Sequence, residues 1–204
     1  MTSRSLLLLW QRIAPLCDAV GRSGLLPLAT ALLGAAVQAA PASLTVERVE
    51  AVVHVQASAT LQADTRTVWD TLVGYEQLPG FIPDMAASRT LQRDGDDAVV
   101  QQSGRAGIGP FKQGFSLTLA VHEVPLQTIT AHALAGDFSR FESSYRLCPG
   151  ATGGTRIEYS ALIEPKAGIA PLLGVPAMRQ TIGRQFDALL AEIERRAAAA
   201  PSRP

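Results

Sequence analysis

The chain has 204 residues, enough for one domain with a sizeable core, and its 18 Lys and Arg balance 18 Asp and Glu. Residues 1–39 hold three of the basic residues and one of the acidic ones, so the remainder carries a formal charge near −2. The sequence also lacks a basic cluster of the kind that binds a phosphate backbone. Nucleic acid is therefore excluded as an expected partner.

The N-terminal segment has the order of a secretory signal peptide. Arginines precede the apolar stretch Leu25–Val37, and Val37-Gln38-Ala39 supplies the small residues that signal peptidase requires. As a helix, this stretch would be about 20 Å long, which is short for a hydrocarbon core of roughly 30 Å. We expect cleavage after Ala39, export to the periplasm or the medium, and no stable membrane span after cleavage. The alternative is an uncleaved anchor.

The rest of the chain is expected to form one domain, since the sequence shows no internal repeat. Residues 40–48, rich in Ala, Pro and Ser, are interpreted as a linker. The folded domain is expected at residues 49–198, followed by a disordered tail at 199–204.

The domain is predicted to begin with a strand, because apolar and polar residues alternate between Glu50 and Gln62. Asp64 or Thr65 then caps a short helix, and a second helical turn is predicted at Tyr75–Leu78. Six further strands follow, separated by turn residues. They are expected near Ser88–Arg93, Ala98–Ile108, Phe111–Val124, Thr128–Ala135, Phe138–Leu147 and Gly154–Glu164.

A long amphipathic helix is predicted at the C-terminus, beginning at Pro171 or Pro176. Its apolar stripe comprises Met178, Ile182, Phe186, Leu189, Leu190 and Ile193. Strands joined by short turns form an antiparallel meander, and the stripe is available to cover one face of it. The predicted fold is therefore α+β: a curved seven-stranded antiparallel sheet packed on a long C-terminal helix, with two short helices after the first strand.

Four segments, taken in order with the C-terminal helix, resemble a known family. They are Thr67–Pro83, Gly104–Phe115, Gly136–Leu147 and Gly154–Lys166. The order resembles the START-like (SRPBCC) superfamily, in the polyketide cyclase/dehydrase branch that includes coenzyme Q-binding START-type proteins. The resemblance covers about Val49–Arg196. It implies a helix-grip fold whose cavity receives hydrophobic ligands such as lipids, isoprenoid quinones or aromatic polyketides, and it transfers no catalytic motif.

Strand parity places the charged side chains of the later strands away from the predicted cavity. These are Arg140, Glu142, Arg146, Arg156, Glu158 and Glu164. On the inward faces, Glu123 is the one charged residue, at a strand end. Tyr145 and Tyr159 are the candidate buried acids, and a phenol with a pKa of about 10 needs an activating neighbour to act as one. No catalytic residue is therefore assigned.

No metal or cofactor site is expected. His54, His122 and His132 lie on three different strands without the spacing of metal ligands. Nucleophile elbows, phosphate-binding loops and CxxC pairs do not occur in the sequence.

The cavity lining is expected to come from a loop at its mouth, from the sheet and from the helix. Pro79-Gly80 and Pro83 interrupt helix, which leaves Phe81 and Ile82 on that loop. The predicted ligand-binding residues are Phe81, Ile82, Phe115, Leu117, Phe141, Tyr145, Tyr159, Met178, Ile182 and Phe186.

We predict an exported, non-catalytic binding or carrier protein for an apolar small molecule, such as a lipid, an isoprenoid or an aromatic compound, held between sheet and helix. One alternative is a polyketide-type cyclase or dehydratase, which a buried ionisable pair in the cavity would favour. The other is a protein-interaction domain whose cavity is filled by its own side chains. The sequence carries no signal for an oligomeric state.

Overall fold

The computed structural model describes residues 42–108, 111–150, 154–168 and 174–200. The predicted signal peptide and the end of the predicted tail lie outside these residues. The described chain forms an eight-stranded sheet in which all neighbouring strands are antiparallel, in the order β1-β2-β8-β7-β6-β5-β4-β3. The strands are β1 (Ser43–Val49), β2 (Val52–Leu61), β3 (Met85–Asp94), β4 (Asp97–Ile108), β5 (Phe111–Val124), β6 (Thr128–Gly136), β7 (Phe138–Pro149) and β8 (Thr155–Pro165).

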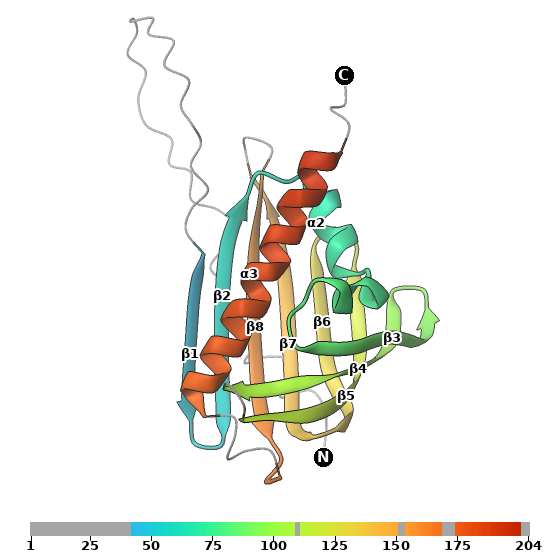
Figure 1. Cartoon of the computed structure of the whole chain (residues 1–204). Coiled ribbons are helices and arrows are strands. Elements are labelled where there is room, and N and C mark those ends of the chain that lie inside the picture. Colours follow the sequence, from blue (N-terminus) through green and yellow to red (C-terminus); the bar gives the residue numbers. More distant parts are fainter. Residues whose placement is uncertain (1–41, 109–110, 151–153, 169–173, 201–204) are drawn as a thin grey trace, which may run out of the picture. The chain divides into compact units, whose positions relative to one another are not determined.

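The sheet is strongly curved. In Figure 1, β3, β4 and β5 run across the direction of β1, β2 and β8, and the C-terminal helix α3 (Val175–Ala199) lies across the concave face. The predicted α+β arrangement, a curved antiparallel sheet closed by a long C-terminal helix, is confirmed. Because each strand alternates its side chains between the two faces, one face can be apolar while the other meets water.

The strand count is corrected from seven to eight. Residues 43–48, interpreted as part of a linker, form the edge strand β1 together with Val49, and this strand pairs with β2 through a two-residue turn at Glu50 and Ala51. Of this strand only Val46 is buried, because an edge strand has a neighbour on one side. Glu50 has a φ of 56°, a conformation for which Gly, Asn or Asp is usual, so the turn has no sequence signal.

Two short helices follow β2, as predicted. The α2 helix (Thr65–Leu72) begins after Asp64, whose carboxylate accepts hydrogen bonds from the backbone N–H and the hydroxyl of Thr67 at 3.0 and 2.8 Å. The 3-10 helix η1 (Tyr75–Gly80) packs on β3, while α2 packs against α3. These two helices therefore extend the cover that α3 gives to the sheet.

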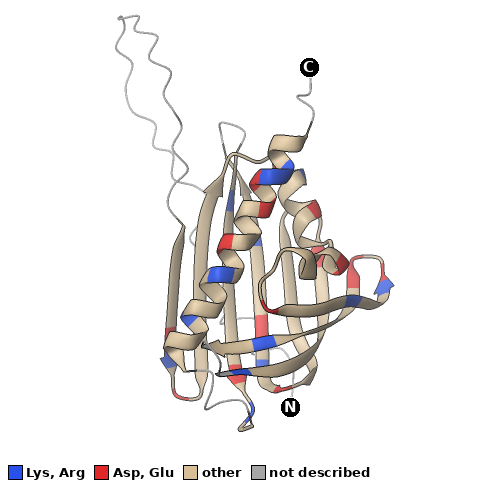
Figure 2. Ribbon diagram, viewed as in Figure 1, with Lys and Arg blue, Asp and Glu red and all other residues tan. Residues whose placement is uncertain are grey.

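The α3 helix begins after Gly174 with Pro176 in its first turn, as one of the two predicted start sites. The side chains of its apolar stripe that become buried are Met178, Phe186, Leu189 and Ile193. Figure 2 shows basic and acidic positions along α3: Arg179 and Arg184 come first, acidic residues follow from Asp187 to Glu194, and Arg195 and Arg196 lie near its end. Among the described residues, no helix combines the length and the apolar character needed to cross a membrane.

Candidate functional site: a cavity between sheet and helix

A cavity of about 250 Å³ lies between the concave face of the sheet and α3. This volume is near the lower end of the range of roughly 300–1,000 Å³ that is typical of small-molecule sites. Its wall combines the inward faces of β4 to β8 with one side of η1 and of α3. Small side chains at Ala106, Ala131 and Ser143 leave this space unfilled.

All the predicted ligand-binding residues except Phe81 line this cavity. They are Ile82, Phe115, Leu117, Phe141, Tyr145, Tyr159, Met178, Ile182 and Phe186. The structure thus brings them together, and their role in ligand binding stays a prediction. Phe81 is absent from the lining; its ring lies under the guanidinium of Arg196, 5.6 Å from its Cζ, and packs on the core. The expectation that Phe81 borders the mouth of the cavity is therefore corrected.

The loop after η1 is fastened to the helix at the edge of the cavity. The carboxylate of Asp84 accepts hydrogen bonds from Lys112 on β5 at 2.5 Å and from Arg184 on α3 at 2.6 Å. The backbone of Asp84 runs so close to β4 that a Cβ at Gly104 would lie 2.6 Å from its carbonyl oxygen. Gln185 adds a hydrogen bond to the carbonyl of Pro83 at 3.2 Å. These contacts fix the position of Ile82, which lies next to them in the chain and lines the cavity.

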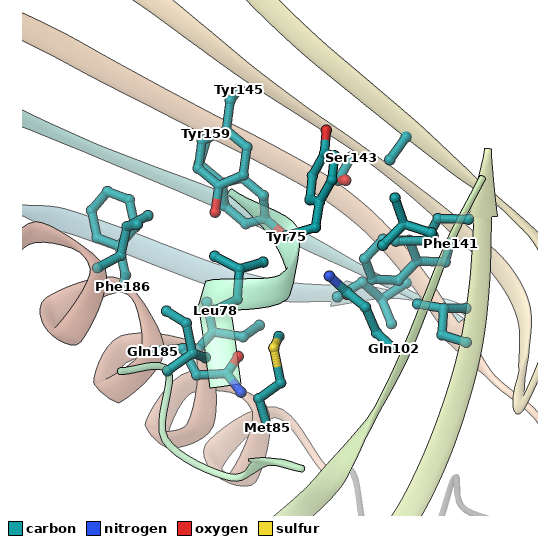
Figure 3. Close-up of a pocket in the computed structure, with 18 of the residues that line it drawn as sticks. Tyr75, Leu78, Met85, Gln102, Phe141, Ser143, Tyr145, Tyr159, Gln185 and Phe186 are labelled. Atoms are coloured by element: carbon teal, nitrogen blue, oxygen red, sulfur yellow. The ribbon is translucent and has the colours of Figure 1, made fainter. Parts of the chain in front are cut away.

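Aromatic rings form two groups in the wall. Tyr145 and Tyr159 are register partners on β7 and β8, and their ring centroids are 4.6 Å apart (Figure 3). The ring of Phe138 meets those of Phe115 and Phe141 edge to face, with centroids at 5.7 and 5.9 Å. Such pairs add to the stability supplied by burial alone. They make a large part of the cavity wall aromatic.

The lining contains no Asp, Glu, His, Lys or Arg among the residues that the structure describes. Its polar side chains are Tyr75, Gln102, Ser103, Ser143, Tyr145, Tyr159, Thr181 and Gln185. Several of these already have partners within the protein, as Gln185 does with Pro83. The predicted outward charges pair on the other face, where Arg140 binds Glu142 at 2.9 Å and Arg156 binds Glu158 at 3.0 Å. The interior of the site is therefore neutral.

A buried hydrogen-bond network stands behind one part of the wall, and the sequence did not predict it. The hydroxyl of Tyr75 donates to the carboxylate of Glu123 at 2.7 Å, and Arg93 binds both oxygens of that carboxylate at 3.0 and 3.1 Å. Tyr75 and Glu123 are each only 6% exposed. The earlier restriction of buried acids to Tyr145 and Tyr159 is thus wrong. The inward parity of Glu123 was the available signal, while its partners come from η1 and β3.

Burial raises the pKa of all three tyrosines. For Tyr75 the desolvation of the phenol is the largest cause, and the hydrogen bond to Glu123 adds to it. For Tyr145 and Tyr159 desolvation is again the largest cause, although both rings keep partial exposure because they border the cavity. All three phenols are therefore neutral at physiological pH.

The histidines do not converge. Within the described part of the chain, no cluster of three or more His, Cys, Asp and Glu side chains could hold a metal ion. His122 forms an exposed pair with Asp97 at 2.8 Å, and His54 and His132 are exposed on β2 and β6.

The sequence profile of the family described as polyketide cyclase/dehydrase and lipid transport matches residues 61–190. The chain belongs to this family. The match extends from the last residue of β2 into α3 and so includes most of the cavity wall. A search of curated proteins found no significant match. None of the comparisons tests the expected relation to coenzyme Q-binding proteins, which stays a prediction.

Solved structures show the fold that members of the START superfamily share with this chain. The Zhui aromatase/cyclase from Streptomyces sp. R1128 is 17% identical with a TM-score of 0.58, covering 74% of this chain and 99% of its own. A START superfamily protein from Mycobacterium smegmatis is 18% identical with a TM-score of 0.57, covering 72% and 97%. The STAR-related lipid transfer protein from Xanthomonas axonopodis is 16% identical with a TM-score of 0.56, covering 74% and 98%. At these identities the likeness supports the fold alone.

The three tyrosines should resist titration in the folded protein. In a spectrophotometric titration, phenolate absorbance should not rise near pH 10, the ordinary pKa, whereas the chain unfolded in denaturant should show all three tyrosines ionising there. Above about pH 10 the unfolded state then binds fewer protons than the folded state, so the free energy of unfolding should fall as the pH rises. This contribution is fully present below pH 10. A phenolate signal near pH 10 with unchanged circular dichroism would contradict the burial of these side chains.

Proposed function

We propose that this chain is a non-catalytic binding or carrier protein for an apolar small molecule. The observation that supports this most directly is a preformed cavity with a mainly apolar wall and no charged side chain among its described lining residues. A general base must reach its substrate by a hydrogen bond, and the described lining contains no carboxylate, imidazole or amine. The family itself combines cyclases or dehydrases with lipid transport, so both activities are within its range.

Hydrophobic transfer is a sufficient driving force for such binding. Burying about 300 Å² of ligand hydrocarbon contributes on the order of 7 kcal/mol before the entropic cost of association, at roughly 25 cal/mol per Å². A rigid wall that exists before binding lowers the ordering cost. The contacts of Asp84 with α3 and β5 give the loop at the cavity edge such rigidity.

A second candidate function is a cyclase or dehydratase. The network of Tyr75, Glu123 and Arg93 favours it, because Tyr75 lines the cavity and its hydroxyl is bound to a buried carboxylate. Conversion of an aromatic polyketone by the wild-type protein, and its loss in Tyr75→Phe, would support this second function. Binding without a change in the mass of the ligand would support the carrier.

The protein-interaction alternative required a cavity filled by the chain's own side chains. The described residues leave about 250 Å³ free, which does not favour that alternative.

Filling the cavity should abolish the uptake of an apolar probe. Ala131 on β6 lines the cavity, and Ala131→Phe should place a phenyl ring in the free space, so the fluorescence gain of N-phenyl-naphthylamine should be lost. Ser143→Phe on β7 provides a second blocking variant. The matched control is Ala135→Phe, on the exposed side of β6, which should bind the probe as the wild type does. Equal probe binding by folded wild-type, Ala131→Phe and Ser143→Phe proteins would refute the cavity as the binding site.

We also propose that the protein acts outside the cytoplasm after loss of residues 1–39. The support is the order of arginines, apolar stretch and Val37-Gln38-Ala39 in the sequence. The intact mass of the protein from the periplasmic fraction should correspond to a chain that begins at Ala40. A full-length species in the membrane fraction would contradict this proposal.

A further inference from the structure

Three hydroxyl groups in the wall of the cavity have no hydrogen-bond partner among the residues that the structure describes. They belong to Tyr145 on β7, Tyr159 on β8 and Thr181 on α3, and all three residues line the cavity. The oxygen of Thr181 is fully buried, and no described group donates to it or accepts from it. In Figure 3 the rings of Tyr145 and Tyr159 project side by side from the sheet into the pocket. The sheet and the helix thus both contribute residues with unpaired hydroxyls to the wall of one space.

The buried hydroxyl of Thr181, and the two tyrosine hydroxyls that border the cavity, can accept a partner from a bound ligand. Leaving a buried polar group unsatisfied costs roughly 1–3 kcal/mol, and buried polar side chains in folded proteins are paired in the large majority of cases. A threonine in a helix usually satisfies its hydroxyl on the carbonyl four residues earlier, and Thr181 does not. The neighbouring polar groups behave differently: Tyr75 is bound to Glu123 and Gln185 to Pro83. Open positions in the described wall therefore include these three hydroxyls, the hydroxyls of Ser103 and Ser143, and the amide oxygen of Gln102, whose nitrogen donates to Ser88 at 3.4 Å.

The chemistry of these hydroxyls determines which ligand atoms can form hydrogen bonds with them. Burial keeps both phenols protonated, so each offers an O–H donor, and a matching ligand atom must be an acceptor. The described lining holds no cation, so a carboxylate would enter without a counter-charge. Burying an unpaired ion costs far more than one hydrogen bond returns.

We propose that the cavity selects neutral ligands that carry a carbonyl-type acceptor oxygen, held by Tyr145 and Tyr159 with Thr181 opposite, and rejects carboxylates of the same shape. This inference rests on the proposed binding function and adds the class of ligand to it. The apolar body of the ligand would lie against residues such as Leu117 and Phe186, which border the same space. Free fatty acids and other carboxylate-bearing molecules fall outside this class.

Three compounds of nearly equal shape test the inference: ethylnaphthalene, acetylnaphthalene and naphthoate. Titration calorimetry or naphthyl fluorescence at pH 7 should show acetylnaphthalene binding about tenfold more tightly than ethylnaphthalene, the equivalent of one or more net hydrogen bonds. Naphthoate should bind at least about tenfold more weakly than ethylnaphthalene. The inference would be overturned if acetylnaphthalene bound no more tightly than ethylnaphthalene, or if naphthoate bound as tightly as either compound.

Variants that remove only hydroxyls identify the donors. In the double variant Tyr145→Phe/Tyr159→Phe the ratio of the two affinities, acetylnaphthalene to ethylnaphthalene, should fall about tenfold, to near one. Thr181→Val tests the helix side by the same ratio, and circular dichroism verifies that each variant is folded. A preference that survives in the double variant would overturn the assignment of the donors. If the wild type binds none of the three compounds, the proposed binding function is wrong. If it binds ethylnaphthalene, and acetylnaphthalene with no higher affinity, the binding function stands and only the proposed class of ligand is wrong.

Discussion

An antiparallel sheet with one apolar face needs a partner that keeps water from that face, and here the partner is α3. Met178, Phe186, Leu189 and Ile193 are buried along one side of this helix, and its start and length allow it to cross the sheet from one end to the other. The helix contacts β1, β2 and β4 directly. Between these contacts the sheet curves away, and small residues such as Ala131 and Ser143 occupy the bend. The cavity is the space that a straight helix and a curved sheet cannot fill together.

The distribution of charge follows from the same arrangement. Ion pairs such as Arg156 with Glu158 lie on the outer face of the sheet, where water compensates both members at little cost. The inward exception is Glu123, and it is held by Arg93 and Tyr75 at the edge of the wall. A buried carboxylate without a partner would be costly, and both oxygens of Glu123 are hydrogen-bonded in this network. The result is a cavity whose described wall carries uncharged polar groups, mostly hydroxyls.

Much of this could be predicted from the sequence, because alternation in strands and the helical stripe depend on local order. Parity placed Phe141, Tyr145 and Tyr159 on the inner face, where the structure has them. The edge strand β1 was missed because Val46 is its one buried residue and its turn uses Glu50 in place of glycine. The Ala, Pro and Ser residues of segment 40–48 indicated a linker instead.

The remaining errors concern contacts between residues far apart in the chain. Phe81 was placed at the mouth because an apolar residue on a loop needs cover, but the cover comes from Arg196 on the last turns of α3. Tyr75, Arg93 and Glu123 meet from η1, β3 and β5, and no local pattern signals that meeting. The missing partners of Tyr145, Tyr159 and Thr181 are likewise visible only once the sheet and helix are placed.

The most direct test of the account is mass spectrometry of what the protein carries. Wild-type protein and the Ala131→Phe variant would be purified in parallel from the native host and extracted with organic solvent. The account predicts a neutral apolar molecule, close to one per chain, in the wild-type extract and its loss from the variant. Equal amounts of the same compound in both extracts, or a carboxylate as the bound species, would contradict it.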